Sequence, residues 1–248
     1  MIPLSLYIHI PWCEKKCPYC DFNSHQSKSA IEESNYIDAL LNDFKQDLSI
    51  YKDSVLTRPI KSIFIGGGTP SLFTGSSIKS IIDRLSLLVE FDPDIEITLE
   101  ANPGSSEAQK FAEFREAGVN RLSIGIQSLN DAHLKALGRV HNANQAIHAV
   151  TKAREAGFES FNLDLMYGLP DQTLDQAVDD LSQLITLAPT HISCYQLTIE
   201  PNTLFHHQPP VTPSDEILWE MQTELQKRLQ QNNYLQYEVS AYAQPKKQ

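Results

Sequence analysis

The chain has 248 residues, of which 41% are apolar and 21% are charged, and its formal net charge is −11 at pH 7. This is an ordinary globular composition, with enough length to bury a sizeable core in one large domain or two small ones. The negative charge opposes broad contact with a phosphate backbone, so nucleic acid is a disfavoured partner.

The beginning of the chain and its few cysteines point to a reducing compartment. Met1–Leu4 contains neither a basic segment nor a long apolar one, and no run of residues approaches the length of a membrane span. Three of the four cysteines lie in one short segment, which is not a disulfide framework. We therefore expect a cytoplasmic protein without a transmembrane segment.

Short apolar stretches with a strand pattern alternate with amphipathic stretches of helical period. The expected strands are Leu4–Ile10, Ile60–Ile65, Ile95–Glu100, Arg121–Ile126, Phe161–Met166 and His191–Leu197. The expected helices between them are Glu32–Ser49, Ser76–Leu88, Glu107–Ala117, Asn144–Ala156 and Leu174–Leu187. This β-α repeat predicts a parallel sheet, which can either close as a barrel or remain open and doubly wound.

The segment after the first expected strand carries Cys13, Cys17 and Cys20 in a Cys-x3-Cys-x2-Cys spacing. Iron–sulfur clusters are usually held by four thiolates, so three on one loop would leave one iron of a cubane open to another ligand. The alternatives are a zinc site completed by His9 or His25 and a redox pair of Cys17 and Cys20. The cluster is the favoured interpretation because the sequence has no second zinc knuckle.

Polar residues and glycines also follow the next four expected strands. They are Gly66–Pro70, Glu100–Pro103, Gln127–Ser128 and Asp164 with Tyr167–Pro170. Each group taken alone is explained as a turn, because glycine permits unusual backbone angles and an X-Pro pair ends an element. Their recurrence at the same end of successive strands instead predicts a shared ligand site at the carboxyl edge of the sheet.

The segment Tyr7–Phe22, with the sequence YIHIPWCEKKCPYCDF, resembles the radical S-adenosylmethionine (SAM) superfamily. The motifs that extend the resemblance, in the order of the family, are Gly66–Pro70, Glu100–Pro103, Ile124–Ser128, Arg139–His141 and Asp164–Pro170. The chain is most similar to the branch that contains oxygen-independent coproporphyrinogen III oxidase and haem chaperones. This resemblance implies an α/β fold, a partial (β/α)6 TIM-like barrel over residues 1–212.

The resemblance also implies the ligands of the site. Cys13, Cys17 and Cys20 would hold a 4Fe-4S cluster whose open iron is chelated by the amino and carboxylate groups of SAM. The other implied cofactor contacts are Tyr7, Tyr19, Gly67, Gly68, Thr69, Glu100, Gln127, Arg139 and Asp164. Glycines allow close approach to the backbone, carboxylates accept from an ammonium or ribose hydroxyls, and a guanidinium pairs with a carboxylate.

One residue separates the two functions within this branch. The oxidase pattern has an additional cysteine two positions after the third cluster ligand, where this chain has Phe22. The substitution favours the haem chaperones, which carry haem as cargo to a recipient protein. The alternative is the oxidase, in which a 5′-deoxyadenosyl radical abstracts hydrogen from a propionate side chain and carbon dioxide leaves. Whether the chain is an enzyme stays open at this point.

The family resemblance also implies a missing part. Members of the family continue into a C-terminal domain, whereas this chain stops soon after an expected helix at Ser214–Gln231 and an expected strand at Tyr234–Ser240. Residues 213–248 are therefore interpreted as the start of a truncated C-terminal region.

Three further residues with metal-binding side chains are assigned structural roles. Cys194 lies in a strand-like run and is expected in the core, since cysteine is among the most buried residue types. His206 and His207 precede a Pro-Pro pair and are expected in a solvated loop rather than at a metal or haem.

Overall fold

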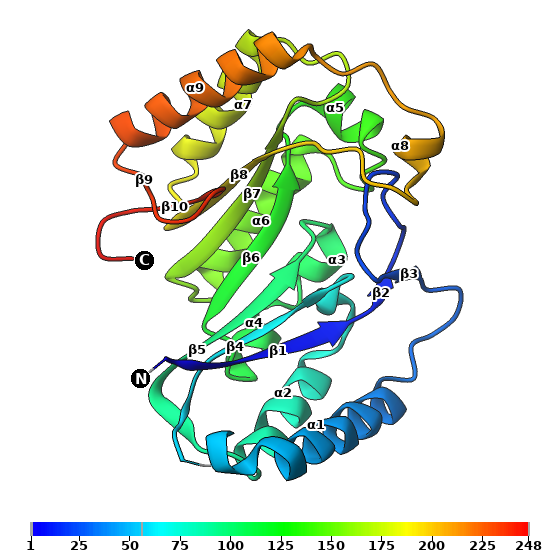
Figure 1. Cartoon of the computed structure of the whole chain (residues 1–248), viewed down its shortest axis with the longest axis vertical. Coiled ribbons are helices and arrows are strands. Elements are labelled where there is room, and N and C mark those ends of the chain that lie inside the picture. The colour runs from blue at the N-terminus through cyan, green and yellow to red at the C-terminus, as the bar shows by residue number, and fades with distance from the viewer. Residues whose placement is uncertain (1, 56, 248) are drawn as a thin grey trace.

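The computed structural model describes residues 2–55 and 57–247. Figure 1 shows one curved sheet with helices along its outer side. The strands, in their order across the sheet, are β1 (Leu4–Ile10), β4 (Ile60–Gly67), β5 (Phe91–Ala101), β6 (Arg121–Gln127), β7 (Ser160–Tyr167), β8 (His191–Gln196), β10 (Ala241–Ala243) and β9 (Leu235–Gln236). Neighbours from β1 to β8 are parallel, and β10 is antiparallel to both β8 and β9.

Each of the six parallel strands is followed by a helix. These helices are α1 (Glu33–Val55), α2 (Gly75–Ser86), α4 (Phe111–Glu116), α6 (Ala143–Glu155), α7 (Leu174–Thr186) and α9 (Asp215–Gln231). Shorter elements lie in the connections: β2 (Trp12–Cys13), β3 (His25–Gln26), the 3-10 helix η1 (Pro70–Leu72), α3 (Ser105–Ala108), α5 (Asp131–Ala136) and α8 (Leu204–His207). The predicted partial (β/α)6 barrel is confirmed, and the doubly wound alternative is wrong.

The barrel stays open at β1. Within the described residues, β1 pairs only with β4, and the sheet ends at β9 on its other side. Side chains alternate along β1, so that Ile8 and Ile10 are buried in the core under the helices while Tyr7 and His9 lie on the opposite, concave face. The core therefore fills the space between sheet and helices, and polar residues are left to line the concave side.

Two expected elements differ from the structure. The strand predicted at Tyr234–Ser240 is wrong, because this segment forms only the two residues of β9 and then bends before β10. The single helix predicted at Glu107–Ala117 is divided into α3 and α4. The division falls next to Lys110, whose ammonium donates to the carbonyl oxygens of Ser71 and Leu72 at 3.1 and 2.9 Å.

Residues after 212 join the same sheet and the same core. Met221, Leu225 and Leu229 of α9 are fully or almost fully buried within the main hydrophobic cluster, and β10 continues the sheet beyond β8. The domain boundary at residue 212 stays a prediction.

None of the helices in residues 2–55 and 57–247 combines the length and the apolar composition that a membrane crossing requires.

A buried carboxylate in α7 fixes the loop that leaves β6. Asp180 is 1% exposed and accepts hydrogen bonds from the Ser128 hydroxyl at 2.6 Å and from the Leu129 N–H at 2.9 Å. The Asn130 N–H donates in turn to the Ser128 oxygen at 3.0 Å. This network holds the carboxyl end of β6 against the helix layer, because each buried donor would otherwise lack a partner.

We predict that Asp180→Ala lowers the free energy of unfolding by about 2 kcal/mol, because it leaves the Leu129 N–H and the Ser128 hydroxyl buried without acceptors. Asp179→Ala is the matched control, since among the described residues the Asp179 carboxylate accepts only from the exposed Gln183 side chain, one turn along the same helix. Its effect should stay within about 0.5 kcal/mol. Urea unfolding of both variants measures this difference, and equal destabilisation would contradict the role of the network.

Candidate functional site

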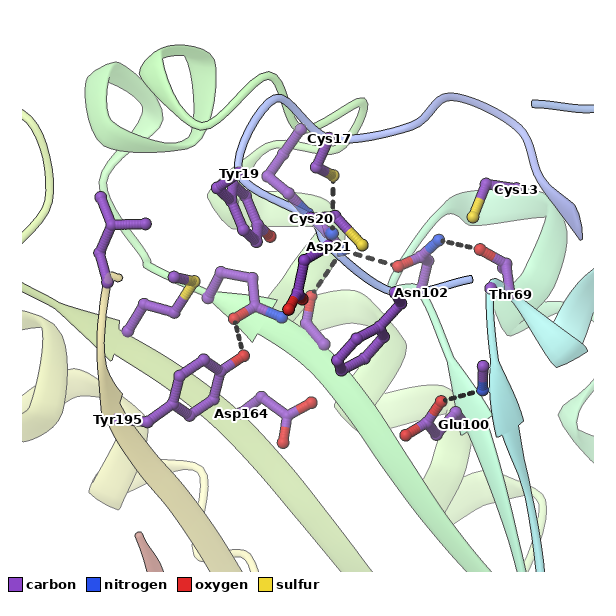
Figure 2. A pocket seen from close by; sticks show the side chains of 18 of the residues that line it. Cys13, Cys17, Tyr19, Cys20, Asp21, Thr69, Glu100, Asn102, Asp164 and Tyr195 are labelled. Carbon is purple, nitrogen blue, oxygen red and sulfur yellow. Dashed lines mark hydrogen bonds between the residues drawn. The ribbon is translucent and has the colours of Figure 1, made fainter. Parts of the chain in front are cut away.

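A cavity of about 360 Å³ lies at the carboxyl ends of the parallel strands. Figure 2 shows side chains from the loop after β4, from β5, β7 and β8, and from the cysteine segment converging on it. Its lining includes every residue that the sequence predicts for the site except Tyr7: Cys13, Cys17, Tyr19, Cys20, Gly67, Gly68, Thr69, Glu100, Gln127, Arg139 and Asp164.

Backbone hydrogen bonds attach the cysteine segment to the glycine loop after β4. The Gly68 N–H donates to the Ile10 carbonyl and the Thr69 N–H to the Trp12 carbonyl, each at 2.7 Å. A Cβ at Gly68 would lie 2.5 Å from the Trp12 carbonyl oxygen. Glycine is therefore required here by contact with the protein itself, in addition to any approach of a ligand.

The neighbouring glycine has a second reason for lacking a side chain. Gly67 has a φ of +118°, which other residues rarely adopt, and a Cβ there would lie 2.7 Å from the His9 ring. The ring of His9 is thus packed against the end of β4, where the glycine loop begins.

The structure gives no support to the zinc interpretation. His9 Nδ1 is 3.0 Å from the Tyr7 hydroxyl and its Nε2 is 2.8 Å from the Asn23 carbonyl oxygen, so both ring nitrogens are engaged. His25 lies exposed in β3. In the described part of the chain, no three His, Cys, Asp or Glu side chains gather around a point that one metal ion would occupy. A four-iron cluster differs, because each thiolate binds its own iron.

A buried guanidinium connects the cysteines to the strands. Arg139 donates through one nitrogen to Cys17 Sγ at 3.4 Å, and through the other to Asn102 Oδ1 at 2.6 Å and the Gly125 carbonyl at 2.9 Å. Asn102 donates in turn to Thr69 Oγ1 at 3.1 Å. Burial alone would lower the pKa of Arg139, but Tyr19 and Cys17 lie beside it and raise the pKa overall. The guanidinium therefore stays positively charged.

Two carboxyl groups form the opposite wall of the cavity (Figure 2). Glu100 accepts from the Gly67 N–H at 2.9 Å, and Asp164 accepts from the Asn162 amide at 2.7 Å. Burial raises the pKa of Glu100 to about 7, with Asp164 adding to the rise, and burial raises the pKa of Asp164 to about 6. The hydrogen bonds oppose both shifts. A cation in the cavity would favour the ionised form of both groups.

Gln127 ends β6 in an unusual backbone conformation. Its φ is +71°, and the register of β6 against β7 shifts between Ile124 and Gln127. The Tyr195 hydroxyl donates to Gln127 Oε1 at 2.7 Å. The strand end is therefore bent so that the Gln127 amide lines the cavity with Tyr195 behind it.

The two predicted tyrosines lie in different places. Tyr19 is in the cysteine loop, lines the cavity and packs against Phe205 with ring centres 6.3 Å apart; burial raises its pKa. Tyr7 is 57% exposed in the middle of β1 and stacks on Phe64 at 6.2 Å, so the structure does not bring it to the cavity.

Sequence reasoning missed several residues of the site. Asn102 belongs to the Glu100–Pro103 motif, and its place between Arg139 and Thr69 shows only in three dimensions. Tyr195 lies near the end of the sixth parallel strand, which none of the predicted motifs follows. Cys194 beside it is buried, and burial raises its pKa to about 12, as expected for a core cysteine.

Comparison with protein-family models identifies the family. The model of the Radical SAM superfamily matches residues 7–184. The chain belongs to the radical SAM superfamily. This membership implies a 4Fe-4S cluster and SAM, and it favours the cluster over the zinc and dithiol alternatives.

Curated relatives align with nearly all of the chain. The chain is 56% identical to a protein named heme chaperone HemW from Haemophilus influenzae, over 97% of this chain and 63% of that protein. It is 51% identical to heme chaperone HemW from Escherichia coli, over 98% and 63%. The chain thus spans less than two thirds of the length of these curated relatives.

Solved structures agree on the fold. Coproporphyrinogen III oxidase (HemN) from Escherichia coli, described as a radical SAM enzyme, superimposes with a TM-score of 0.87 at 28% identity, over 98% of this chain and 56% of that one. SuiB from Streptococcus suis bound to SAM gives a TM-score of 0.60 at 16% identity, over 92% and 48%. The second likeness concerns the fold alone.

The donor set of the cavity fits the cofactors that the family implies. Cys13, Cys17 and Cys20 are free thiols on one loop at the cavity. Arg139 supplies a permanent positive charge beside them, and Glu100 with Asp164 supplies carboxylates on the other side. The guanidinium would suit the carboxylate of SAM, and the two carboxylates would suit its ammonium and sulfonium groups.

We predict that Gly68→Ala lowers the iron content of the anaerobically reconstituted chain, because the added methyl group displaces the backbone at Trp12, next to Cys13. Gly157→Ala is the control. Gly157 also has a positive φ, of +83°, but a Cβ there meets nothing within 4 Å. It should cost about 1 kcal/mol of stability and leave the iron content unchanged. Equal iron contents in both variants would contradict the packing role of Gly68.

We predict that SAM binds the cluster-loaded chain more weakly as the pH falls from 8 to 6. Protonation of Glu100, with its pKa of about 7, removes a negative charge that favours the sulfonium cation. One pH unit below this pKa only about a tenth of the group is ionised, so the affinity for SAM should fall about tenfold. Glu100→Gln should bind weakly at both pH values with a flatter profile in calorimetry. The amino group of SAM titrates equally with both proteins, so parallel profiles would exclude Glu100 as the titrating group.

Proposed function

We propose that the chain is the cofactor-binding part of a cytoplasmic haem chaperone of the radical SAM superfamily. In this proposal it holds a 4Fe-4S cluster and SAM, carries haem as cargo and passes it to a recipient protein. The observation that carries the proposal is the 56% identity to heme chaperone HemW over 97% of this chain, compared with 28% identity to the oxidase HemN.

Phe22 supports the chaperone over the oxidase. Its side chain is 58% exposed and lines the cavity close to Cys20 in the sequence. The oxidase pattern has a cysteine at this position. An aromatic hydrocarbon group there supplies neither a thiol nor any other hydrogen donor for oxidase chemistry, while it offers apolar surface to a flat macrocycle.

Individual residues are assigned roles within this proposal. Cys13, Cys17 and Cys20 hold the cluster, and Arg139 pairs with the SAM carboxylate. The remaining cofactor contacts are Tyr19, Gly67, Gly68, Thr69, Glu100, Gln127 and Asp164, and Tyr7 is left out because it does not line the cavity. When bound, a reduced cluster would be a source of one electron for SAM. The residues of this chain orient the cofactor and keep a fixed positive charge beside Cys17.

The oxidase remains the second candidate, because the HemN superposition covers 98% of this chain with a TM-score of 0.87. The two candidates differ in what happens to a porphyrin. A chaperone binds haem and releases it unchanged, whereas the oxidase removes carbon dioxide from the propionates of coproporphyrinogen with stoichiometric cleavage of SAM.

We predict that the anaerobically reconstituted chain binds haem saturably and releases no carbon dioxide from coproporphyrinogen under reducing conditions. Haem titration by absorbance, 5′-deoxyadenosine analysis and release of labelled carbon dioxide measure these properties. Decarboxylation in step with 5′-deoxyadenosine formation would make the chain an oxidase despite Phe22.

Two cysteine variants separate the cluster from general effects of losing a thiol. Cys17→Ala should abolish cluster iron and sulfide, whereas Cys194→Ala, which removes a buried core thiol, should retain both. Full iron retention by Cys17→Ala would refute the three-thiolate assignment.

A further inference from the structure

The free edge of β1 and the exposed face of α1 enclose a groove of about 490 Å³. Its lining includes Tyr7 and His9 of β1 and, on α1, Tyr36, Phe44, Asp43 and Asp47. Figure 1 shows β1 at the open margin of the sheet with α1 running beneath it. We propose that this groove binds an extended, lysine- or arginine-bearing segment of a partner protein, which adds a strand to the edge of the sheet.

The backbone of β1 offers hydrogen-bonding groups along the groove. The Tyr36 hydroxyl on α1 donates to the His9 carbonyl at 2.5 Å, so the backbone of His9 faces the groove and away from β4. Because alternate residues of a strand point their N–H and C=O groups to the same side, those of Tyr7 face the groove as well. No other strand of residues 2–55 and 57–247 pairs with this side of β1.

Apart from the His9 carbonyl, which the Tyr36 hydroxyl occupies, the edge of β1 is unprotected. Exposed edge strands are usually short, or carry lysine, proline or a bulge that prevents pairing with another chain. β1 has seven residues with the sequence LSLYIHI, which includes no lysine, acidic residue or proline, and its register shift against β4 lies at its start, between Leu4 and Ser5, so that Leu6–Ile10 pair regularly. At the other margin of the same sheet, β9 has only two residues. The edge of β1 is therefore the one suited to accept a strand.

Helix α1 supplies the side-chain contacts. Tyr36, Leu40 and Phe44 are spaced four residues apart, which places them on one face of the helix beside the groove. All three are only partly buried against the core. A strand between a sheet edge and a helix is a known mode of peptide recognition, in which the backbone pairing gives affinity and the side-chain contacts give specificity.

The negative charge of the groove favours a basic partner. Asp43 and Asp47 lie one helical turn apart on the groove side of α1, and both are exposed. Neither forms an ion pair with another described residue, unlike Asp38 of the same helix, which binds Arg84 at 2.7 Å. Two carboxylates without counter-ions beside a free strand edge complement a strand that carries basic side chains.

The proposal is tested with a fluorescein-labelled peptide of sequence Thr-Lys-Val-Thr-Leu-Lys-Thr, blocked at its unlabelled end and titrated with the whole chain by anisotropy. Saturable binding is expected, and exchange of both lysines for glutamate should weaken it at least about tenfold. Equal binding of the acidic peptide, or no binding at millimolar chain, would overturn the proposal.

Protein variants test the side of the helix that is used. Asp43→Lys combined with Asp47→Lys should weaken binding at least about tenfold. Asp53→Lys, an exposed change further along α1 and outside the groove, should leave it unchanged. All changes are on the surface, and circular dichroism confirms that the fold is kept. Equal affinities of the double variant and the Asp53→Lys variant for the peptide would overturn the assignment of the groove.

N-methylation tests the backbone pairing. A strand presents alternate N–H groups to its neighbour, so methyl groups on one alternate set of peptide nitrogens should abolish binding while those on the other set should not. Equal effects of both sets would exclude strand addition. The chain could instead associate with itself. If it does, and if the double aspartate variant abolishes that association, the groove binds a second copy of the chain and the partner proposal is overturned.

Discussion

The geometry of the cavity depends on two backbone hydrogen bonds. The Gly68 N–H donates to the Ile10 carbonyl, and the Thr69 N–H donates to the Trp12 carbonyl. They join the loop after β4 to the segment that leads into the cysteines. The bonds require close approach of two backbones, which only a residue without a side chain permits at Gly68. The position of Cys13 relative to the parallel strands therefore depends on main-chain contacts more than on its own side chain.

Alternation of side chains gives the sheet two chemically different faces. Isoleucines and leucines of the parallel strands fill the core under the helices, and the opposite face carries carboxyl, amide and hydroxyl groups. Glu100 and Asp164 lie on that second face, where burial without full hydrogen bonding raises their pKa values. The same alternation that stabilises the fold thus places titratable groups where a cationic ligand is favoured.

The sequence predicted the parallel strands well because each combines an apolar core face with turn residues at its end. Leu4–Ile10 agrees with β1 at both ends, and polar strand ends located most of the cavity. Local pattern did not predict the reversal at Tyr237–Ser240, since β10 forms by pairing with the distant β8. Nor did it reveal that Tyr195 binds Gln127 or that Asn102 binds Arg139, because these partners are 68 and 37 positions apart.

The contact between Arg139 and Cys17 joins residues 122 positions apart in the chain. A ribosome therefore releases the cysteine loop long before the guanidinium that lies beside it. During synthesis the three thiols are presented on a loop without this positive charge, and the cavity is complete only after β7 and β8 have been added. Only the finished fold therefore presents the three thiols with a positive charge beside Cys17.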